Sequence, residues 1–196
     1  QEQKTYFDVL RLTVDDKYSW DFAMLGVGLR YINGVGKPDM LHYVESFGME
    51  GHYDFASNRG YIWSRTFPLL KRALLLGVGR DNFAYAFPND DYVGKVNCGF
   101  NEQIVTKPHN MYLQIWVQDG LPALLAFLAL YLLLFGRTIR KCFKKGKWNH
   151  SQKISLAFLC GVSGYFVAGL ANDSSICVAP VFWDLFGVAF AVLRSE

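Results

Sequence analysis

Three long apolar runs near the carboxyl end constrain this chain more than any other feature. Residues 121–135 and 154–171 contain no charged side chain, and residues 176–193 contain only Asp184. A helix needs about 20 residues to cross a bilayer, and several such runs are difficult to bury in a small soluble domain. The alternative is a buried helical hairpin in a soluble protein. The pattern favours three membrane spans, and we place these at residues 115–136, 153–171 and 176–193.

The loop between the first two spans is basic, which predicts their orientation. Residues 137–152 contain no acid, and their basic residues are Arg137, Arg140, Lys141, Lys144, Lys145 and Lys147. Short loops rich in Lys and Arg stay on the cytoplasmic side. The carboxyl terminus is then cytoplasmic as well, whereas residues 1–118 and the short loop 172–175 lie outside the cytoplasm. No signal peptide opens the chain, so we expect further spans upstream, in a larger multi-span protein of which this is a fragment.

Charge and cysteine usage exclude two classes of protein. The net charge is only +3, whereas a nucleic-acid-binding face would be strongly basic. The spacing of Cys98, Cys142, Cys160 and Cys177 matches neither a zinc site nor a disulfide framework. We expect Cys160 and Cys177, which lie in apolar runs, to be buried, and we expect no metal site and no cofactor.

The extracytoplasmic segment 1–118 is expected to be largely helical. Residues 61–76 form an amphipathic pattern in which Ile62, Phe67, Leu70 and Leu74 share one face and Arg65, Lys71 and Arg72 fall elsewhere. Pro68 predicts a kink or a break there, and the glycines of residues 77–79 predict the end of the helix.

The rest of the segment gives weaker patterns. Residues 8–14 fit either a short strand or a short helix, residues 25–36 with four glycines and residues 81–91 fit loops, and residues 98–107 are ambiguous. Residues 108–110 are expected to open the helix that leads into the first span.

Three residues could carry chemistry at the membrane surface. Arg59 precedes the amphipathic helix, Arg80 follows the Gly-Val-Gly turn, and His109 stands at the mouth of the first span. A guanidinium suits phosphate oxygens, and an imidazole can move a proton near neutral pH. Each also has a simpler explanation: a surface or ion-paired arginine, a histidine that holds the structure, and an ordinary turn. Spacing alone leaves the chemistry open.

The order of these motifs resembles the carboxyl-terminal part of the bacterial O-antigen ligase and O-antigen polymerase superfamily. The stretches that carry the resemblance are NRGYIWSRTFPLLKRALLLGVGRDNFAYAFPNDDYVGK, KPHNMYLQIWVQDGLPALLAFLALYLLL and GYFVAGLANDSSICVAPVFWDLFGV. They extend over roughly residues 57–190, and the arginine, the glycine turn and the histidine occur in family order. Asn58 and Arg80 depart from the usual family pattern.

The resemblance implies a membrane glycosyltransferase of GT-C-like architecture in the bacterial cytoplasmic membrane. It would transfer or polymerise a glycan from undecaprenyl diphosphate, at the outer face, to a glycan, lipid or wall acceptor, and the fragment alone is not expected to be active. Arg59 matches the family arginine, a candidate for donor binding, and His109 matches the family histidine, a candidate base. Arg80, Lys107, Asn110 and Asp173 are candidate substrate-binding residues, although Asp173 could instead cap the third span.

Two other classes of function remain open at this point. A transporter or another non-catalytic membrane component of polysaccharide export would place polar residues at mid-membrane, but here the spans are nearly free of charge. A binding module with a membrane anchor would need fewer than three spans. Asp184, the one acid within a span, has no role assigned.

Overall fold

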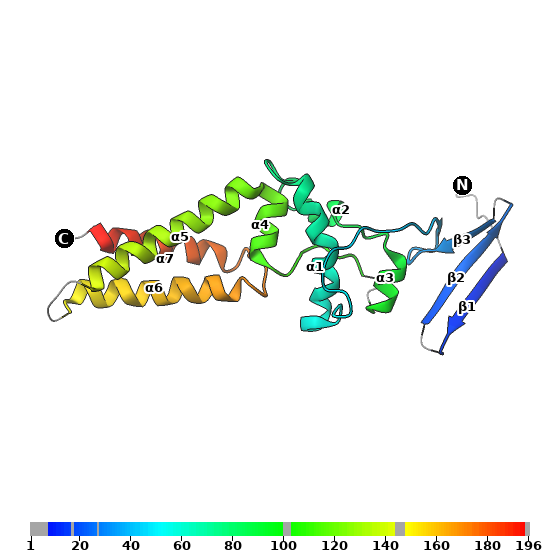
Figure 1. Ribbon diagram of the computed structural model, residues 1–196, viewed down its shortest axis with the longest axis horizontal. Coiled ribbons are helices and arrows are strands. Elements are labelled where there is room, and N and C mark those ends of the chain that lie inside the picture. Colours follow the sequence, from blue (N-terminus) through cyan, green and yellow to red (C-terminus); the bar gives the residue numbers. More distant parts are fainter. Residues whose placement is uncertain (1–7, 17, 27, 100–102, 144–147, 195–196) are drawn as a thin grey trace. The chain divides into compact units, whose positions relative to one another are not determined.

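The structure, a computed structural model, describes residues 8–16, 18–26, 28–99, 103–143 and 148–194 (Figure 1). The chain divides into two compact units. The first unit is Gln1–Pro68 with Phe87–Thr106, and the second is Leu69–Ala86 with Lys107–Glu196. Helices make up 53% of the described residues, in agreement with the expected mainly α class.

The first unit opens with a four-stranded antiparallel meander. Its strands, in spatial order, are β1 (Asp8–Val14), β2 (Tyr18–Leu25), β3 (Gly28–Ile32) and β4 (Pro38–Asp39). Residues 8–14, which fitted either a strand or a helix, form strand β1, and β3 lies inside residues 25–36, which were expected to be a loop. The expectation of a largely helical segment was wrong for this part, because pairing between neighbouring strands decides the structure here more than local propensity does.

The remainder of the first unit packs around helix α1 (Phe55–Arg72). Tyr61 and Ile62 are buried on it, and Phe87 packs edge-on against Tyr61 with 6.3 Å between the ring centroids. The non-helical backbone angles of α1 lie at residues 56–58, where φ is positive, and the helix continues through Pro68. The break predicted at Pro68 is therefore absent, and the helix ends before the predicted residue 76. The short helix α3 (Tyr92–Asn97) completes the unit.

The second unit contains a bundle of three helices, α5 (Leu121–Cys142), α6 (His150–Ala168) and α7 (Ala179–Arg194), which lie side by side in Figure 1 with α6 antiparallel to the other two. Aromatic rings fill its centre: Phe127 stacks on Phe166 at 4.7 Å, and Tyr165 stacks on Phe182 at 4.0 Å. These ring contacts hold the three helices together, although the helices are apolar on most of their surface.

Two shorter helices precede the bundle, α2 (Phe83–Ala86) and α4 (Met111–Asp119). The helix α2 lies within residues 81–91, which were expected to be a loop. Gly120, with φ of 91°, separates α4 from α5, so the first apolar helix covers residues 121–142 and not the predicted 115–136. Within the described part of the chain, α5 alone has the length and composition of a membrane span.

The basic region that was predicted to follow the first span is partly helical. Arg137, Arg140 and Lys141 belong to α5, whereas Lys144, Lys145 and Lys147 lie outside the described residues. Lys141 is buried, and its Nζ donates to Ser151 Oγ at 2.7 Å and to the carbonyl of Val192 at 3.0 Å. Its charge thus ties the ends of α5, α6 and α7 together.

The cysteines are free, and two of them are placed differently from the prediction. Cys160 and Cys177 are exposed on the bundle, because the apolar runs of α6 and of the segment before α7 present residues on every side and only part of each surface meets a neighbour.

Candidate active site

An imidazole and a carboxylate meet where α4 begins. His109 Nδ1 lies 2.9 Å from Asp173 Oδ2; the histidine side chain is 47% exposed and the aspartate side chain only 9%. His109 stands just before Asn110, the N-cap of α4, and Asp173 lies in the loop between α6 and α7. Residues 64 positions apart in sequence are therefore paired.

Several hydrogen bonds hold this loop against α4. The amide of Met111 donates to the carbonyl of Gly169 at 2.8 Å, and Asn110 Nδ2 donates to the carbonyl of Leu170 at 2.8 Å. The amide of Ser174 donates to Gln114 Oε1 at 2.9 Å. The pairing of His109 with Asp173 is thus fixed on both sides of the aspartate.

The geometry of the pair suits proton transfer. When Nδ1 donates to the carboxylate, Nε2 of His109 is left as the acceptor on the exposed side of the ring. The second oxygen of Asp173, Oδ1, is buried with no hydrogen-bond partner among the described residues. A buried carboxylate in this position stabilises the imidazolium that forms when the histidine takes a proton.

A cavity of about 610 Å³ lies between α4, α5 and α7. Its polar lining residues are Arg80, Asp81, Gln114, Gln118, Asp119 and Ser174. Its apolar lining includes Phe127, Leu130 and Trp183. Because Ser174 directly follows Asp173, the cavity wall and the histidine–aspartate pair share one loop. The cavity combines polar groups and apolar walls, as a site for an amphipathic ligand requires.

Arg80 contributes the positive charge of this cavity. Its Nε donates to Asp119 Oδ1 at 2.9 Å, and the arginine side chain is 83% exposed. The hydrogen bond from Arg80 to Asp119 raises the pKa of the guanidinium. The bond uses Nε only, so the Nη donors remain for an anion.

The glycine turn before Arg80 has a structural role. The amides of Val78 and Gly79 donate to the carbonyls of Val117 and Gln118, at 2.8 and 3.0 Å. Gly77 has φ of 68°, and a Cβ there would collide with the carbonyl of Gln118. These two amides are therefore engaged with α4, and the turn serves to hold Arg80 beside the cavity.

Arg59 belongs to the first unit. Its Nη1 donates to the carbonyl of Ala56 at 2.6 Å, and its Nε is buried without a hydrogen-bond partner in the described part of the chain. The left-handed residues 56–58 bring that carbonyl back to the arginine. Arg59 and His109 lie in different units, so their predicted meeting at one site stays a prediction.

Of the two remaining predicted residues, Asn110 forms several hydrogen bonds within the fold, and Lys107 forms no ion pair with a described residue. Asn110 Oδ1 accepts from the amides of Tyr112 and Leu113, both at 3.0 Å, and its Nδ2 binds Leu170. This side chain is engaged in capping α4, as the predicted helix start requires, and it positions the loop that carries Asp173. Lys107 is half-buried and forms no ion pair with any described residue.

Sequence reasoning missed a buried cluster in the first unit. Arg65 was placed on the polar side of its helix, but it is buried; its Nε lies 2.9 Å from Asp91 Oδ2, and its guanidinium packs over the rings of Tyr53 and Tyr61. Burial raises the pKa of Tyr61, with the charge of Asp91 adding to the effect. No spacing in the sequence indicates this pair, since 26 residues separate the partners.

The cavity residues of α4 were also missed. Gln114 and Gln118 are buried although polar, and Asp119 pairs with Arg80. A helix that carries amides on an otherwise apolar face was the available signal. Among the described residues, no group of three or more His, Cys, Asp or Glu side chains could hold a metal ion.

The second unit thus combines an apolar helical bundle with a polar cavity and a histidine–aspartate pair. A sequence model of the O-antigen ligase family matches residues 19–128, which is more than half of the chain, and the protein therefore belongs to that family. The predicted family is confirmed. The match includes strands β2, β3 and β4, which the resemblance did not use, and ends before Asp173.

The family gives the function in outline. It indicates a ligase- or polymerase-like activity on lipid-linked glycans, in polysaccharide biosynthesis at a bacterial membrane. Searches of curated proteins and of solved structures found no match to this chain.

Proposed function

We propose that the protein is a glycosyltransferase that moves a glycan from undecaprenyl diphosphate to an acceptor hydroxyl at the outer face of the cytoplasmic membrane. The observation that carries the proposal is the His109–Asp173 pair beside the cavity that contains Arg80. A donor of this kind has an anionic diphosphate and an apolar polyprenyl chain. The cavity offers an arginine, hydrogen-bonding amides and an apolar wall to such a ligand.

In the proposed reaction, the acceptor oxygen attacks the anomeric carbon of the donor sugar while the bond from that carbon to the diphosphate oxygen breaks. His109 Nε2 takes the proton of the acceptor hydroxyl, and Asp173 stabilises the imidazolium. Undecaprenyl diphosphate leaves with the bonding electron pair. One displacement of this type inverts the anomeric configuration.

Cationic groups stabilise the charge that develops on the leaving diphosphate, which is commonly the largest contribution to catalysis. Arg80 is assigned this role from its exposed guanidinium at the cavity, and Lys107 from its unpaired charge two positions before His109. Arg59 is assigned to the donor diphosphate from its match to the family arginine. The carboxylates Asp81 and Asp119 at the cavity would accept hydrogen bonds from sugar hydroxyls.

The proposed topology follows from the basic end of α5. α5 would cross from outside to inside, α6 from inside to outside, and α7 back, with residues 1–118 outside and the carboxyl terminus in the cytoplasm. The pair and the cavity then lie at the outer surface, where the lipid-linked donor is presented.

The test uses His109→Ala and Asp173→Asn in the full-length protein, with transfer measured on purified enzyme and lipid-linked donor. Loss of the base is expected to reduce the rate by about 10²–10⁴-fold. The amide of Asp173→Asn would donate to Nδ1 and leave a proton on Nε2, so this variant should lose a similar factor while its membrane level stays unchanged.

The matched control is His42→Ala, because His42 forms a second histidine–carboxylate pair, with Asp90 at 3.3 Å, on the surface of the first unit. Transfer should survive that change. Near-normal transfer by His109→Ala would rule out the assigned base. Analysis of surface polysaccharide in a deletion strain then separates the acceptors: unpolymerised units indicate a polymerase, and unattached long chains indicate a ligase.

A further inference from the structure

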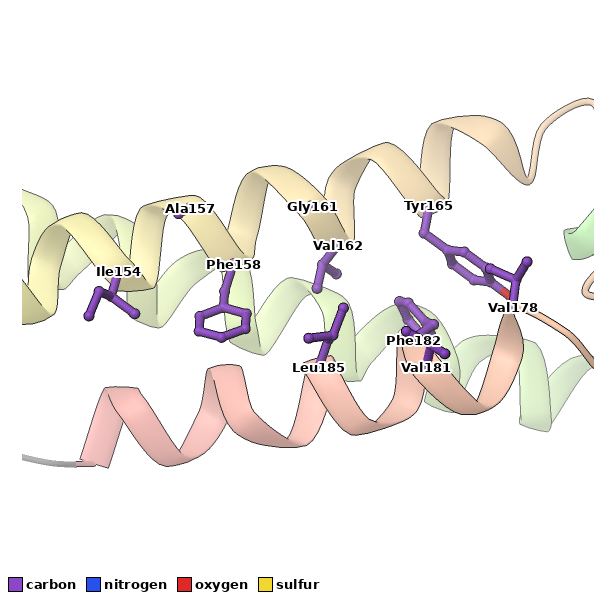
Figure 2. A pocket seen from close by; sticks show the side chains of 10 residues that line it. All are labelled: Ile154, Ala157, Phe158, Gly161, Val162, Tyr165, Val178, Val181, Phe182 and Leu185. Carbon is purple, nitrogen blue, oxygen red and sulfur yellow. The ribbon is translucent and has the colours of Figure 1, made fainter.

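A second, apolar groove of about 450 Å³ runs between α6 and α7. Figure 2 shows Phe158 and Val162 of α6 directed toward Leu185 of α7, with Ile154 at one end and Tyr165 and Val178 at the other. The volume lies within the range of about 300–1,000 Å³ that is typical of small-ligand sites. The groove shares only Tyr165 and Phe182 with the cavity of the candidate active site, so it is a separate feature.

The end of the groove marked by Ile154 is positively charged. On a helix, residues four apart lie one above the other. Lys153 therefore stands one turn before Ala157 and two turns before Gly161, and His150 stands one turn before Ile154 and two turns before Phe158; these four later residues line the groove. The side chains of Lys153 and His150 are exposed and form no ion pair with any described residue.

The sequence that leads into this end is also basic. Residues 137–153 contain seven Lys or Arg and no acid, although Lys141 is buried between the helices. An occupant that matches both the apolar groove and its basic end has an apolar chain and an anionic head group. A neighbouring protein helix matches less well, because loops on the basic side of membrane proteins are themselves rich in Lys and Arg.

We propose that the groove between α6 and α7 binds one acyl chain of an anionic phospholipid, whose phosphate is held by Lys153 and His150. The proposal depends on the membrane location that the family indicates, and it holds whether or not the glycan-transfer assignment is correct. The bound lipid would fill the groove between α6 and α7, with its head group at the end marked by Ile154.

The glycines of α6 provide a matched pair of variants. A Cβ added at Gly161 or at Gly164 meets nothing within 4 Å, so either site accepts a larger side chain, but only Gly161 lines the groove. The protein is placed in nanodiscs that contain phosphatidylglycerol and phosphatidylcholine, then extracted in mild detergent, and retained lipid is measured by native mass spectrometry. Gly161→Leu should lose the retained phosphatidylglycerol, whereas Gly164→Leu should keep it.

The head-group contact is tested separately. Lys153→Gln should weaken retention of phosphatidylglycerol by about fivefold, as expected for one lysine at an anionic surface, and Lys153→Arg should restore it. Equal retention of the two lipids by the unaltered protein, or equal retention by the two leucine variants, would overturn the proposal.

A measurement on the unaltered protein covers the case in which the variants fail to accumulate. Phosphatidylglycerol with a photoreactive acyl chain should label peptides from residues 154–165 or 178–185. Labelling confined to other peptides would mean that another part of the protein covers the groove, and the proposal would be wrong.

Discussion

At the residue scale, the two buried carboxylates of Asp91 and Asp173 are used in different ways. Asp173 faces a half-exposed imidazole and keeps one oxygen without a hydrogen-bond partner within the described residues, so its charge is available to a reaction. Asp91 is surrounded: it pairs with Arg65, accepts from Tyr61 Oη at 3.2 Å and accepts from the amide of Gly94 at 3.1 Å. We therefore assign a chemical role to Asp173 and a stabilising role to Asp91.

This assignment gives a prediction for Arg65→Met. The change leaves the carboxylate of Asp91 buried without its cation, and breaking a buried pair in this way costs about 3–5 kcal/mol of unfolding free energy. The thermal midpoint of the purified protein, followed by tryptophan fluorescence, should fall by several degrees.

The control is Arg11→Met, because Arg11 and Asp21 form an ion pair of similar length, 2.6 Å, on the exposed surface of β1 and β2. Solvent screens such a pair, so its loss should leave the midpoint unchanged. A similar midpoint for both variants would show that the Arg65–Asp91 pair does not hold the first unit together.

At the element scale, the close contact between the glycine turn and the start of α5 determines where Arg80 lies. Gly77 packs against the segment that contains Gly120, and Gly120 packs against the segment that contains Gly77. A Cβ at Gly77 would collide with the carbonyl of Gln118, and a Cβ at Gly120 would collide with the carbonyl of Leu75. Both residues have positive φ, of 68° and 91°. The strand-like exchange of hydrogen bonds between residues 74–79 and residues 117–121 requires both glycines.

Alanine at either glycine should therefore destabilise the second unit. A left-handed conformation costs a residue with a side chain about 1–3 kcal/mol when the surroundings enforce it, and the collision adds to this. Gly136→Ala is the control, since Gly136 lies in α5 and a Cβ there meets nothing within 4 Å. Midpoints for Gly77→Ala and Gly120→Ala should lie below that of Gly136→Ala, and equal midpoints would contradict the proposed contact.

The same contact explains one error of sequence reasoning. The residues of α4 and α5 read as one apolar stretch, which predicted a span beginning at residue 115. The break at Gly120 depends on packing against residues 74–79, and no pattern within α4 and α5 themselves reveals that contact. The sheet was missed for a related reason: pairing between β1, β2 and β3 decides their structure more than local propensity does.

At the scale of the whole molecule, the sequence predicted what depends on local composition. The family, the helical bundle, the start of α4 at Asn110 and the glycine turn all follow from runs and motifs that are contiguous in the chain. The pairs of the candidate site, His109 with Asp173 and Arg80 with Asp119, join residues 64 and 39 positions apart, and tertiary packing alone brings these together.

The topology is the whole-molecule prediction that most directly tests the proposed function, because the donor is presented outside the cytoplasm. Two single-cysteine variants suffice. The first retains Cys177, which is exposed in the segment before α7, and the second is W148C, which replaces an exposed tryptophan before α6. A membrane-impermeant maleimide added to intact spheroplasts should label Cys177 and leave W148C unlabelled, because the basic loop is retained in the cytoplasm. Labelling after detergent is added should be equal for both variants, which shows that each thiol is reactive.

The opposite labelling pattern in intact spheroplasts would place His109 and Asp173 on the cytoplasmic side, away from the proposed donor. The glycan-transfer assignment would then have no substrate at its site.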